Sequence, residues 1–140
     1  MFGLLRRIPL YAFLLALYNL LLLSRAAAVD PLTQTVFQFS LRGGTPLAPT
    51  VGDVLIMAGV VSLYIEIFKA TRTSAASILD HLFSMVVFVV FLVEFLLVDF
   101  CATVPFLTLT MMSFLDVVAG FTVTISTARR DLGLGGGTGE

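Results

Sequence analysis

The sequence has no tryptophan, one cysteine (Cys101) and one histidine (His81) among its 140 residues. A single cysteine excludes an internal disulfide and any metal cluster built on cysteine ligands. One cysteine and one histidine together also exclude the usual structural zinc sites, so we expect no metal and no cofactor. Without tryptophan, any aromatic belt at a membrane surface must come from Tyr11, Tyr18 and Tyr64 together with some of the phenylalanines.

Charge is scarce as well. Only 12% of the residues are charged, 59% are hydrophobic, and the net charge is −1; the mean hydropathy is +1.06. A soluble domain of this size could not hide so much apolar surface. The net charge gives no electrostatic basis for binding nucleic acid. The composition therefore indicates a small multi-pass membrane protein whose first partner is the lipid bilayer.

Catalytic motifs are also missing from the sequence. It has no glycine-rich phosphate loop, no Ser-His-Asp arrangement and no His-Glu-x-x-His helix. Carboxylates inside a membrane could support aspartyl chemistry, but the paired motifs of such enzymes do not occur here. The chain is also short for a transporter built from inverted repeats. We therefore expect no enzymatic activity.

Four apolar runs dominate the chain, at about residues 8–23, 51–68, 77–98 and 104–126. At 1.5 Å per residue they are roughly 24 to 35 Å long, against about 30 Å of hydrocarbon. These runs predict an all-α protein, a four-helix transmembrane bundle that forms one domain over residues 1–131. The glycine-rich residues 132–140 are predicted to be a disordered tail.

The basic residues predict the orientation. With both termini in the cytoplasm, the inner segments contain Arg6, Arg7, Lys69, Arg72, Arg129 and Arg130, whereas the outer segments contain only Arg25 and Arg42. Short loops rich in Lys and Arg stay on the cytoplasmic side. The pattern predicts a protein of the bacterial inner membrane with its N- and C-termini inside.

The first run has a second interpretation, a cleaved secretory signal peptide. Arg6 and Arg7 precede an apolar core, and the alanines at 26–28 offer a cleavage site with small residues. The run is longer than most such cores, contains Asn19, and is followed by Arg25 directly before the alanines. These features favour an uncleaved span; cleavage would leave three spans.

The segment between the first two spans alternates in polarity. Its residues Thr33, Thr35, Phe37, Phe39 and Leu41 share one side and lead to Arg42-Gly43-Gly44. This pattern predicts a short periplasmic β-hairpin over about 33–48, with Phe37 and Phe39 at the lipid surface or over the bundle. Thr50 and Asp53 fit a capping box that opens the second span.

Asp116 lies near the middle of the fourth run, on a stripe with Ser113 and Gly120. A carboxylate at that depth costs several kcal/mol unless it is protonated, paired or hydrated. Three interpretations remain open: a protonated hydrogen-bond donor between closely packed helices, a group that handles ions or protons, or a salt bridge to a basic residue of another protein.

Other polar residues form stripes on the remaining spans. On the second span, Gly59, Ser62 and Glu66 share one face, and Lys69 is placed to pair with Glu66 at i, i+3, which favours an interfacial ion pair over a functional carboxylate. On the first span, the expected packing stripe is Ala12, Ala16 and Asn19.

On the third span, Asp80 and His81 are predicted in the first helical turn. Asp80 then faces the positive end of the helix dipole, which favours a capping role, and His81 is expected to be an interfacial hydrogen-bonding residue rather than a proton shuttle. Glu94 lies deeper and either contacts another helix or has a functional role. Neither Glu94 nor Asp116 has a cation expected at its own depth. Phe88 and Phe91 are expected to face lipid.

Three segments resemble parts of small, uncharacterised four-span proteins of the bacterial inner membrane. They are residues 66–73 (EIFKATRT), 93–97 (VEFLL) and 116–124 (DVVAGFTVT). That family has no established activity. The resemblance therefore implies a membrane location and four spans, and it transfers no site residue.

Two functional hypotheses follow from these patterns. In the first, the chain is a non-catalytic accessory or assembly subunit that docks through its polar helix faces onto a second copy or a partner membrane protein. In the second, an oligomer forms a proton or small-cation pathway. Asp116 and Glu94 would be its relay, and Glu66, Asp80 and His81 would lie at its cytoplasmic mouth.

Overall fold

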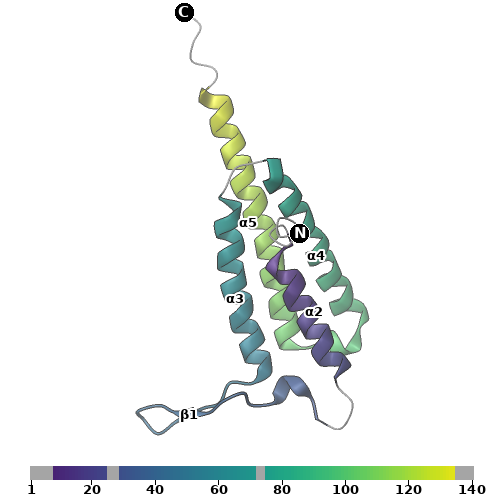
Figure 1. Ribbon diagram of the computed structural model, residues 1–140, viewed down its shortest axis with the longest axis vertical. Helices are drawn as coiled ribbons and strands as arrows, with labels where there is room; N and C mark the ends of the chain where they lie inside the picture. The colour runs from purple at the N-terminus through teal and green to yellow at the C-terminus, as the bar shows by residue number, and fades with distance from the viewer. Residues whose placement is uncertain (1–7, 25–28, 72–74, 135–140) are drawn as a thin grey trace, which may run out of the picture.

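The computed structural model describes residues 8–24, 29–71 and 75–134, and in this part of the chain four α-helices follow one another (Figure 1). They are α2 (Leu10–Leu23), α3 (Val51–Ala70), α4 (Ala75–Leu97) and α5 (Val104–Leu134), with 3₁₀ turns η1 (Pro31–Thr33) and η2 (Asp99–Cys101). An antiparallel hairpin of β1 (Phe39–Ser40) and β2 (Pro46–Leu47) lies between α2 and α3. The predicted four-helix bundle with one short hairpin is confirmed.

Successive helices run in opposite directions (Figure 1). The hairpin, η1 and η2 lie at one end of the bundle, which we call the hairpin end. The end of α3 and the start of α4 lie at the other, which we call the cluster end. α5 continues beyond its neighbours there. It extends to Leu134, past the predicted end of the span and into the first residues of the predicted tail; residues 135–140 lie outside the described part.

Three helices are long and apolar enough to cross a bilayer, over Val51–Ala70, Leu79–Leu97 and Val104–Ser126. α2 has 14 residues and is about 21 Å long, which is less than the roughly 30 Å of a hydrocarbon core. The alternative cleavage site at 26–28 lies outside the described residues, as do Arg6, Arg7, Arg25 and Arg72.

The face by which α2 packs differs from the predicted one. Its buried residues are Tyr11, Leu14 and Tyr18, at i, i+3 and i+7, whereas Ala16 of the expected small-residue stripe is exposed. Tyr11 and Tyr18 are therefore core residues, so of the three tyrosines that could form an aromatic belt only Tyr64 is largely exposed. The hydroxyl group of each buried tyrosine has a hydrogen-bond partner, so these polar rings can occupy positions in an apolar core.

The aromatic core lies between these tyrosines and the two last helices. Phe91 of α4 and Phe106 of α5 are fully buried; their ring centroids are 5.3 Å apart, and Phe91 lies 6.4 Å from Tyr11. The expectation that Phe91 faces lipid was therefore wrong. Phe88 is partly buried against Phe114. Apolar periodicity does not separate a lipid-facing from a core-facing ring, because both surroundings are apolar.

The hairpin is shorter than the alternating pattern predicted. Only Phe39 pairs with Leu47 and Ser40 with Pro46, and a separate bridge joins Thr35 to Thr50. The turn uses Gly44 at φ 79°, a conformation that glycine adopts without steric penalty. Earlier in the segment, residues 31–33 form a 3₁₀ turn instead of a strand, because Pro31 begins it and Asp30 caps it.

The start of α3 is fixed by the predicted capping box. The Thr50 hydroxyl accepts a hydrogen bond from the Asp53 N–H at 3.2 Å, and the Asp53 carboxylate accepts one from the Thr50 N–H at 2.9 Å. Two donors that the helix leaves unpaired are thereby satisfied. The capping box is confirmed, and it sets the point at which the hairpin meets the bundle.

Candidate functional site

A cluster of polar side chains lies between the helices at the cluster end of the bundle. We call it the Glu66 cluster; it consists of Glu66, Lys69, Asp80, His81, Ser84 and Asp116, which line one small cavity. α3, α4 and α5 each contribute to it through stripes at helical spacing. The cavity offers about 10 Å³ to the centre of a water molecule, which is on the order of one water.

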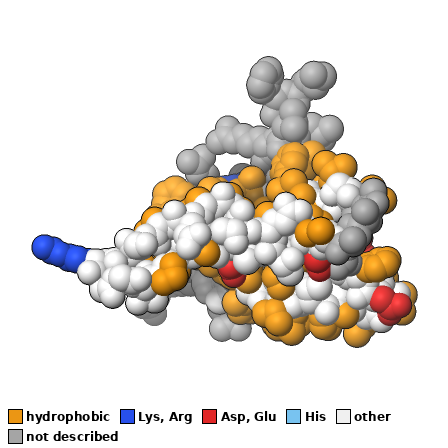
Figure 2. Space-filling view, turned by 90° about the horizontal axis from the view of Figure 1, so that it is seen from below, with side chains coloured by type: hydrophobic (Ala, Val, Ile, Leu, Met, Phe, Trp, Pro, Cys, Tyr) orange, Lys and Arg blue, Asp and Glu red, His pale blue; other side chains and the backbone are white. Residues whose placement is uncertain are grey.

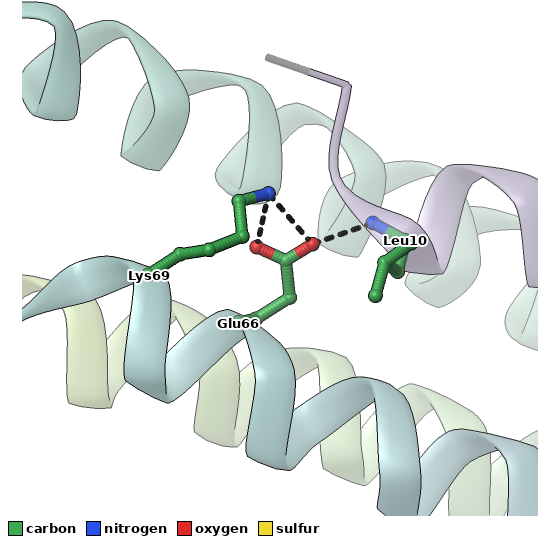
Figure 3. Close-up of polar contacts among 3 residues, drawn as sticks. All are labelled: Leu10, Glu66 and Lys69. Carbon is green, nitrogen blue, oxygen red and sulfur yellow. Dashed lines mark hydrogen bonds and ion pairs between the residues drawn. The ribbon is translucent and has the colours of Figure 1, made fainter. Parts of the chain in front are cut away.

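Glu66 makes both a hydrogen bond to a neighbouring helix and an ion pair (Figure 3). Its Oε1 accepts a hydrogen bond from the backbone N–H of Leu10 at 2.7 Å, and Lys69 Nζ lies 3.1 Å from Oε1 and 2.9 Å from Oε2. The side chain of Glu66 is 7% exposed and that of Lys69 is 31% exposed. The predicted i, i+3 ion pair is confirmed.

The bond from Leu10 to Glu66 was not predicted. Leu10 is the first residue of α2, and the N-cap position before it is Pro9, which offers no side-chain cap. The first N–H groups of a helix need acceptors and carry a partial positive charge, so a carboxylate from a neighbouring helix satisfies both demands. The missing cap was visible in the sequence. Which of the acidic residues supplies the acceptor depends on how the helices pack.

Asp80 does not have the predicted capping role. α4 begins at Ala75, two residues before the predicted start, so Asp80 is its sixth residue and no acidic residue lies in the first turn. The side chain instead lines the cavity of the Glu66 cluster. Its Oδ1 is buried and has no hydrogen-bond partner among the described residues, which is costly for a carboxylate oxygen unless water or a proton satisfies it.

His81 is buried between α4 and α5, next to Gly120. A Cβ atom at Gly120 would overlap the imidazole ring, so the absence of a side chain there creates the space for the histidine. The ring also lies 6.1 Å from that of Phe121. Gly120 was predicted as a close-packing position, and the structure shows that a side chain rather than a backbone fills the space.

Asp116 is 5% exposed and faces the same cavity. Ser84 of α4 lines this cavity as well, so the two side chains face the same space between α4 and α5, in agreement with the predicted contact between helices. Lys69, which the sequence placed toward the end of its own helix, lines the same cavity as Asp116. The long aliphatic stem of lysine lets its ammonium lie at a different depth from its own Cα.

The remaining predicted packing residues lie inside the bundle. Gly59, Ser62 and Ser113 are buried. The carbonyl oxygen of Gly59 accepts a hydrogen bond from the Tyr11 hydroxyl at 2.9 Å. A Cβ at Gly59 would lie 2.7 Å from Leu109 Cδ2. These small residues let α2, α3 and α5 approach one another, as expected for helix packing in membranes.

A second polar contact lies toward the hairpin end. The Asn19 amide of α2 donates a hydrogen bond to Glu94 Oε2 of α4 at 2.9 Å and another to the Leu15 carbonyl oxygen at 3.1 Å. Of the two predicted roles for Glu94, the contact to another helix is thus present. Nearby, Cys101 is fully buried. Burial, with the Glu94 charge as the second cause, raises the pKa of this thiol to about 11, so it stays protonated at neutral pH.

The Glu66 cluster and the Asn19–Glu94 pair do not touch. Asp80 and Glu94 are 14 residues apart on one helix, which corresponds to about 21 Å. The apolar core that contains Tyr11, Phe91 and Phe106 packs along this length. The structure therefore brings Glu66, Asp80, His81 and Asp116 together and leaves Glu94 apart from them. Among the described residues, no three His, Cys, Asp or Glu side chains are placed to hold a metal ion.

The length and composition of the helices, with polar residues gathered inside the bundle, define a small multi-pass membrane protein. No protein-family model, no curated protein and no solved structure matches this chain. The resemblance to four-span inner-membrane proteins is thus supported only in its helix count, and the Glu66 cluster must be interpreted from its own geometry.

Proposed function

We propose that this chain is a non-catalytic accessory or assembly subunit of a homo-oligomer or of a larger complex in the bacterial inner membrane. The observation that best supports this is the way its membrane-depth polar groups are used. Glu66 binds Lys69 and the start of α2, Glu94 binds Asn19, and Asp116 faces Ser84. Groups engaged in this way hold four helices in one arrangement, which is the requirement of a scaffold.

The proposal places the docking surface on the outside of the helices. The polar stripes that we first expected to dock lie inside the bundle, so a partner cannot reach them without opening it. The outer faces of α3, α4 and α5 are instead apolar. In a bilayer such faces associate through close packing of side chains. The proposed orientation, with both termini in the cytoplasm, puts the Glu66 cluster on the cytoplasmic side.

Purification with the surrounding lipid tests this proposal. The tagged chain, extracted from its own membrane directly into lipid nanodiscs, should appear by native mass spectrometry as a homo-oligomer or with a companion protein in fixed stoichiometry. A monomer without a companion, in discs large enough to hold several copies, would contradict it. Glu66→Ala, which removes a contact that holds α2 to α3, provides a second test. We expect it to reduce the fraction of assembled protein. An unchanged fraction would show that assembly does not depend on the arrangement of the four helices.

One observation favours a second function, a proton or small-cation pathway. The buried Asp80 Oδ1 and the water-sized cavity beside Asp116 form a place where a proton or one water can reside. Against it, the apolar core separates the cluster from Glu94. The predicted relay from Asp116 to Glu94 therefore needs a second chain or a change of conformation.

Asp116→Asn separates the two functions. The amide keeps the size of the carboxyl and can still form hydrogen bonds, but it cannot take up or release a proton at neutral pH. For a scaffold, we expect unchanged assembly in nanodiscs and an unchanged, background-level proton flux in liposomes. For a pathway, flux of the unsubstituted protein should exceed that of empty liposomes and fall to background in the variant. Ser113→Ala, one helical turn away, controls for a mere packing change.

A further inference from the structure

The hairpin projects sideways from the bundle at the start of α3, as Figure 1 shows from the side and Figure 2 shows from the hairpin end. α3 is long and apolar enough to cross a bilayer. An element that extends sideways from the end of a membrane-spanning helix lies over the surrounding lipid and not over its own bundle. The hairpin therefore forms a shelf at the membrane surface.

The base of this shelf is held firmly to α3. The Val36 N–H donates to the Pro49 carbonyl oxygen, and the Val51 N–H donates to the Gln34 carbonyl oxygen, both at 2.9 Å. Just before this point, Leu32 is buried in the core. The hydrogen bonds anchor both chain segments at the base, so the position of the hairpin relative to α3 is fixed by backbone contacts.

An apolar groove lies in the corner between the shelf and α3. Its volume is about 510 Å³, and it is lined by Phe37, Phe39, Leu47, Ala48, Pro49, Asp53 and Met57. This volume is within the range of small-molecule sites. The rings of Phe37 and Phe39 stack with their centroids 6.0 Å apart and form one flat apolar wall. Four of the lining side chains, those of Phe37, Phe39, Leu47 and Met57, are about half exposed, although each is hydrophobic.

The groove continues into the lipid-facing surface of α3. Asp53 and Met57 are four residues apart and share a helix face, and the exposed Val60 and Val61 follow one turn on. Met57 lies about 9 Å along the helix from Val51, which is the depth of the acyl chains. A molecule in the groove therefore has one end beside the hairpin at the membrane surface and the other end in the hydrocarbon.

Asp53 is the one charged residue among the groove's lining residues. It lies at the end of the groove nearest the membrane surface, in the first turn of α3. An apolar channel with a carboxylate at its membrane-surface end is complementary to a lipid with a cationic amine in its headgroup. An exposed ion pair of this kind contributes a modest but measurable preference.

We propose that this groove binds a phospholipid with an ammonium headgroup. One acyl chain lies against Phe39 and Met57, and the ammonium lies beside the Asp53 carboxylate. The bound lipid fills the corner under the hairpin and ties the shelf to the bilayer surface. This inference rests on the membrane location of the helices and does not depend on the proposed scaffold function.

The absence of tryptophan from the chain makes the test direct. The full-length Phe39→Trp variant contains a single tryptophan, whose fluorescence is quenched by bromine atoms in contact with it. Vesicles would contain phosphatidylethanolamine and phosphatidylglycerol in equal amounts, with brominated acyl chains on only one of the two lipids. Gln38→Trp is the matched control, since Gln38 directly precedes β1 and successive side chains of an extended chain alternate in direction; Phe37→Trp repeats the measurement from the other ring.

We expect the Phe39→Trp emission to be quenched more by brominated phosphatidylethanolamine, with a preference of about twofold to fivefold, as for an exposed charge pair. Asp53→Asn should abolish the preference while leaving quenching by either lipid, since its amide oxygen can still cap Thr50; Asp53→Glu should retain it. The Gln38→Trp emission should be quenched less and show no preference.

Three results would overturn the proposal. Equal quenching by the two brominated lipids would show an interfacial hairpin without an amine site. Equal quenching of the Phe39→Trp and Gln38→Trp variants would show that the hairpin has no lipid-binding side. An absence of quenching in both the Phe37→Trp and Phe39→Trp variants would show that water or another protein fills the groove.

Discussion

Glu66 in α3 and Glu94 in α4 are both glutamates within apolar helices, and the bundle satisfies them differently. Glu66 contacts an ammonium group and the first N–H of a neighbouring helix. Glu94 contacts one uncharged amide, that of Asn19. The first arrangement combines a charge pair with a helix dipole, whereas the second is a single hydrogen bond between two helices.

The difference has a consequence for stability. If Glu66 is removed, both Lys69 and the start of α2 lose their partner at a site that is only partly open to water. If Glu94 is removed, only one amide loses a bond, and Asn19 still donates to the Leu15 carbonyl oxygen. The position of α2 should therefore depend mainly on its contact at the cluster end.

The largest effect is expected for Glu66→Ala. We expect it to lower the free energy of unfolding by about 2–3 kcal/mol, because it leaves a partly buried backbone donor without an acceptor and breaks a partly buried ion pair. Unfolding by a denaturing detergent in mixed micelles, followed by circular dichroism, measures this. Glu66→Gln keeps an acceptor for Leu10 and should lose less. Ile67→Ala, on the exposed face of the same turn, is the control, and an equal loss in both alanine variants would contradict the prediction.

A smaller loss is expected for Gly120→Ala. The added Cβ would overlap the rigid His81 ring; overpacking costs about 1–3 kcal/mol, and the better helix propensity of alanine offsets up to about 1 kcal/mol. We expect a net loss of about 1 kcal/mol in the same unfolding assay.

Gly59→Ala is the matched comparison for Gly120→Ala. Its Cβ would meet the ends of the Leu109 and Met112 side chains, at 2.7 and 2.9 Å, and these flexible ends can move. Gly59→Ala should therefore be the milder change. A larger loss at Gly59 than at Gly120 would show that the His81 ring is free to shift and that the packing at the cluster end is looser than the geometry implies.

The contacts that the sequence predicted correctly are those between residues close together in the chain. The spacing of Glu66 and Lys69 on one helix predicted their ion pair, and Thr50 with Asp53 predicted the capping box, because both depend on local geometry alone. The stripes of Gly59, Ser113 and Gly120 correctly indicated which faces of α3 and α5 lie inside.

The contacts between distant segments could not be predicted in this way. The bond from Leu10 to Glu66 depends on the depth at which α2 begins, and the closeness of Lys69 to Asp116 depends on a side-chain conformation. The buried face of α2 was mistaken because small residues were taken to mark the packing surface. Tyrosines mark it instead, since each hydroxyl finds a partner in the bundle. In an apolar chain, hydrophobicity does not distinguish a core residue from a lipid-facing one.

The smallest effects are expected at the Asn19–Glu94 pair, and they complete the comparison with Glu66. Hydrogen bonds between membrane helices contribute about 0.6 kcal/mol on average, so Asn19→Ala and Glu94→Ala should each cost about that much. A double-mutant cycle should return a coupling of similar size. Glu94→Gln should change stability by less than about 0.5 kcal/mol, since its amide oxygen can still accept the Asn19 bond. A loss at Glu94→Gln as large as at Glu66→Gln would mean that the charge of Glu94 has a partner beyond the described residues, and the two ends would then be stabilised in the same way.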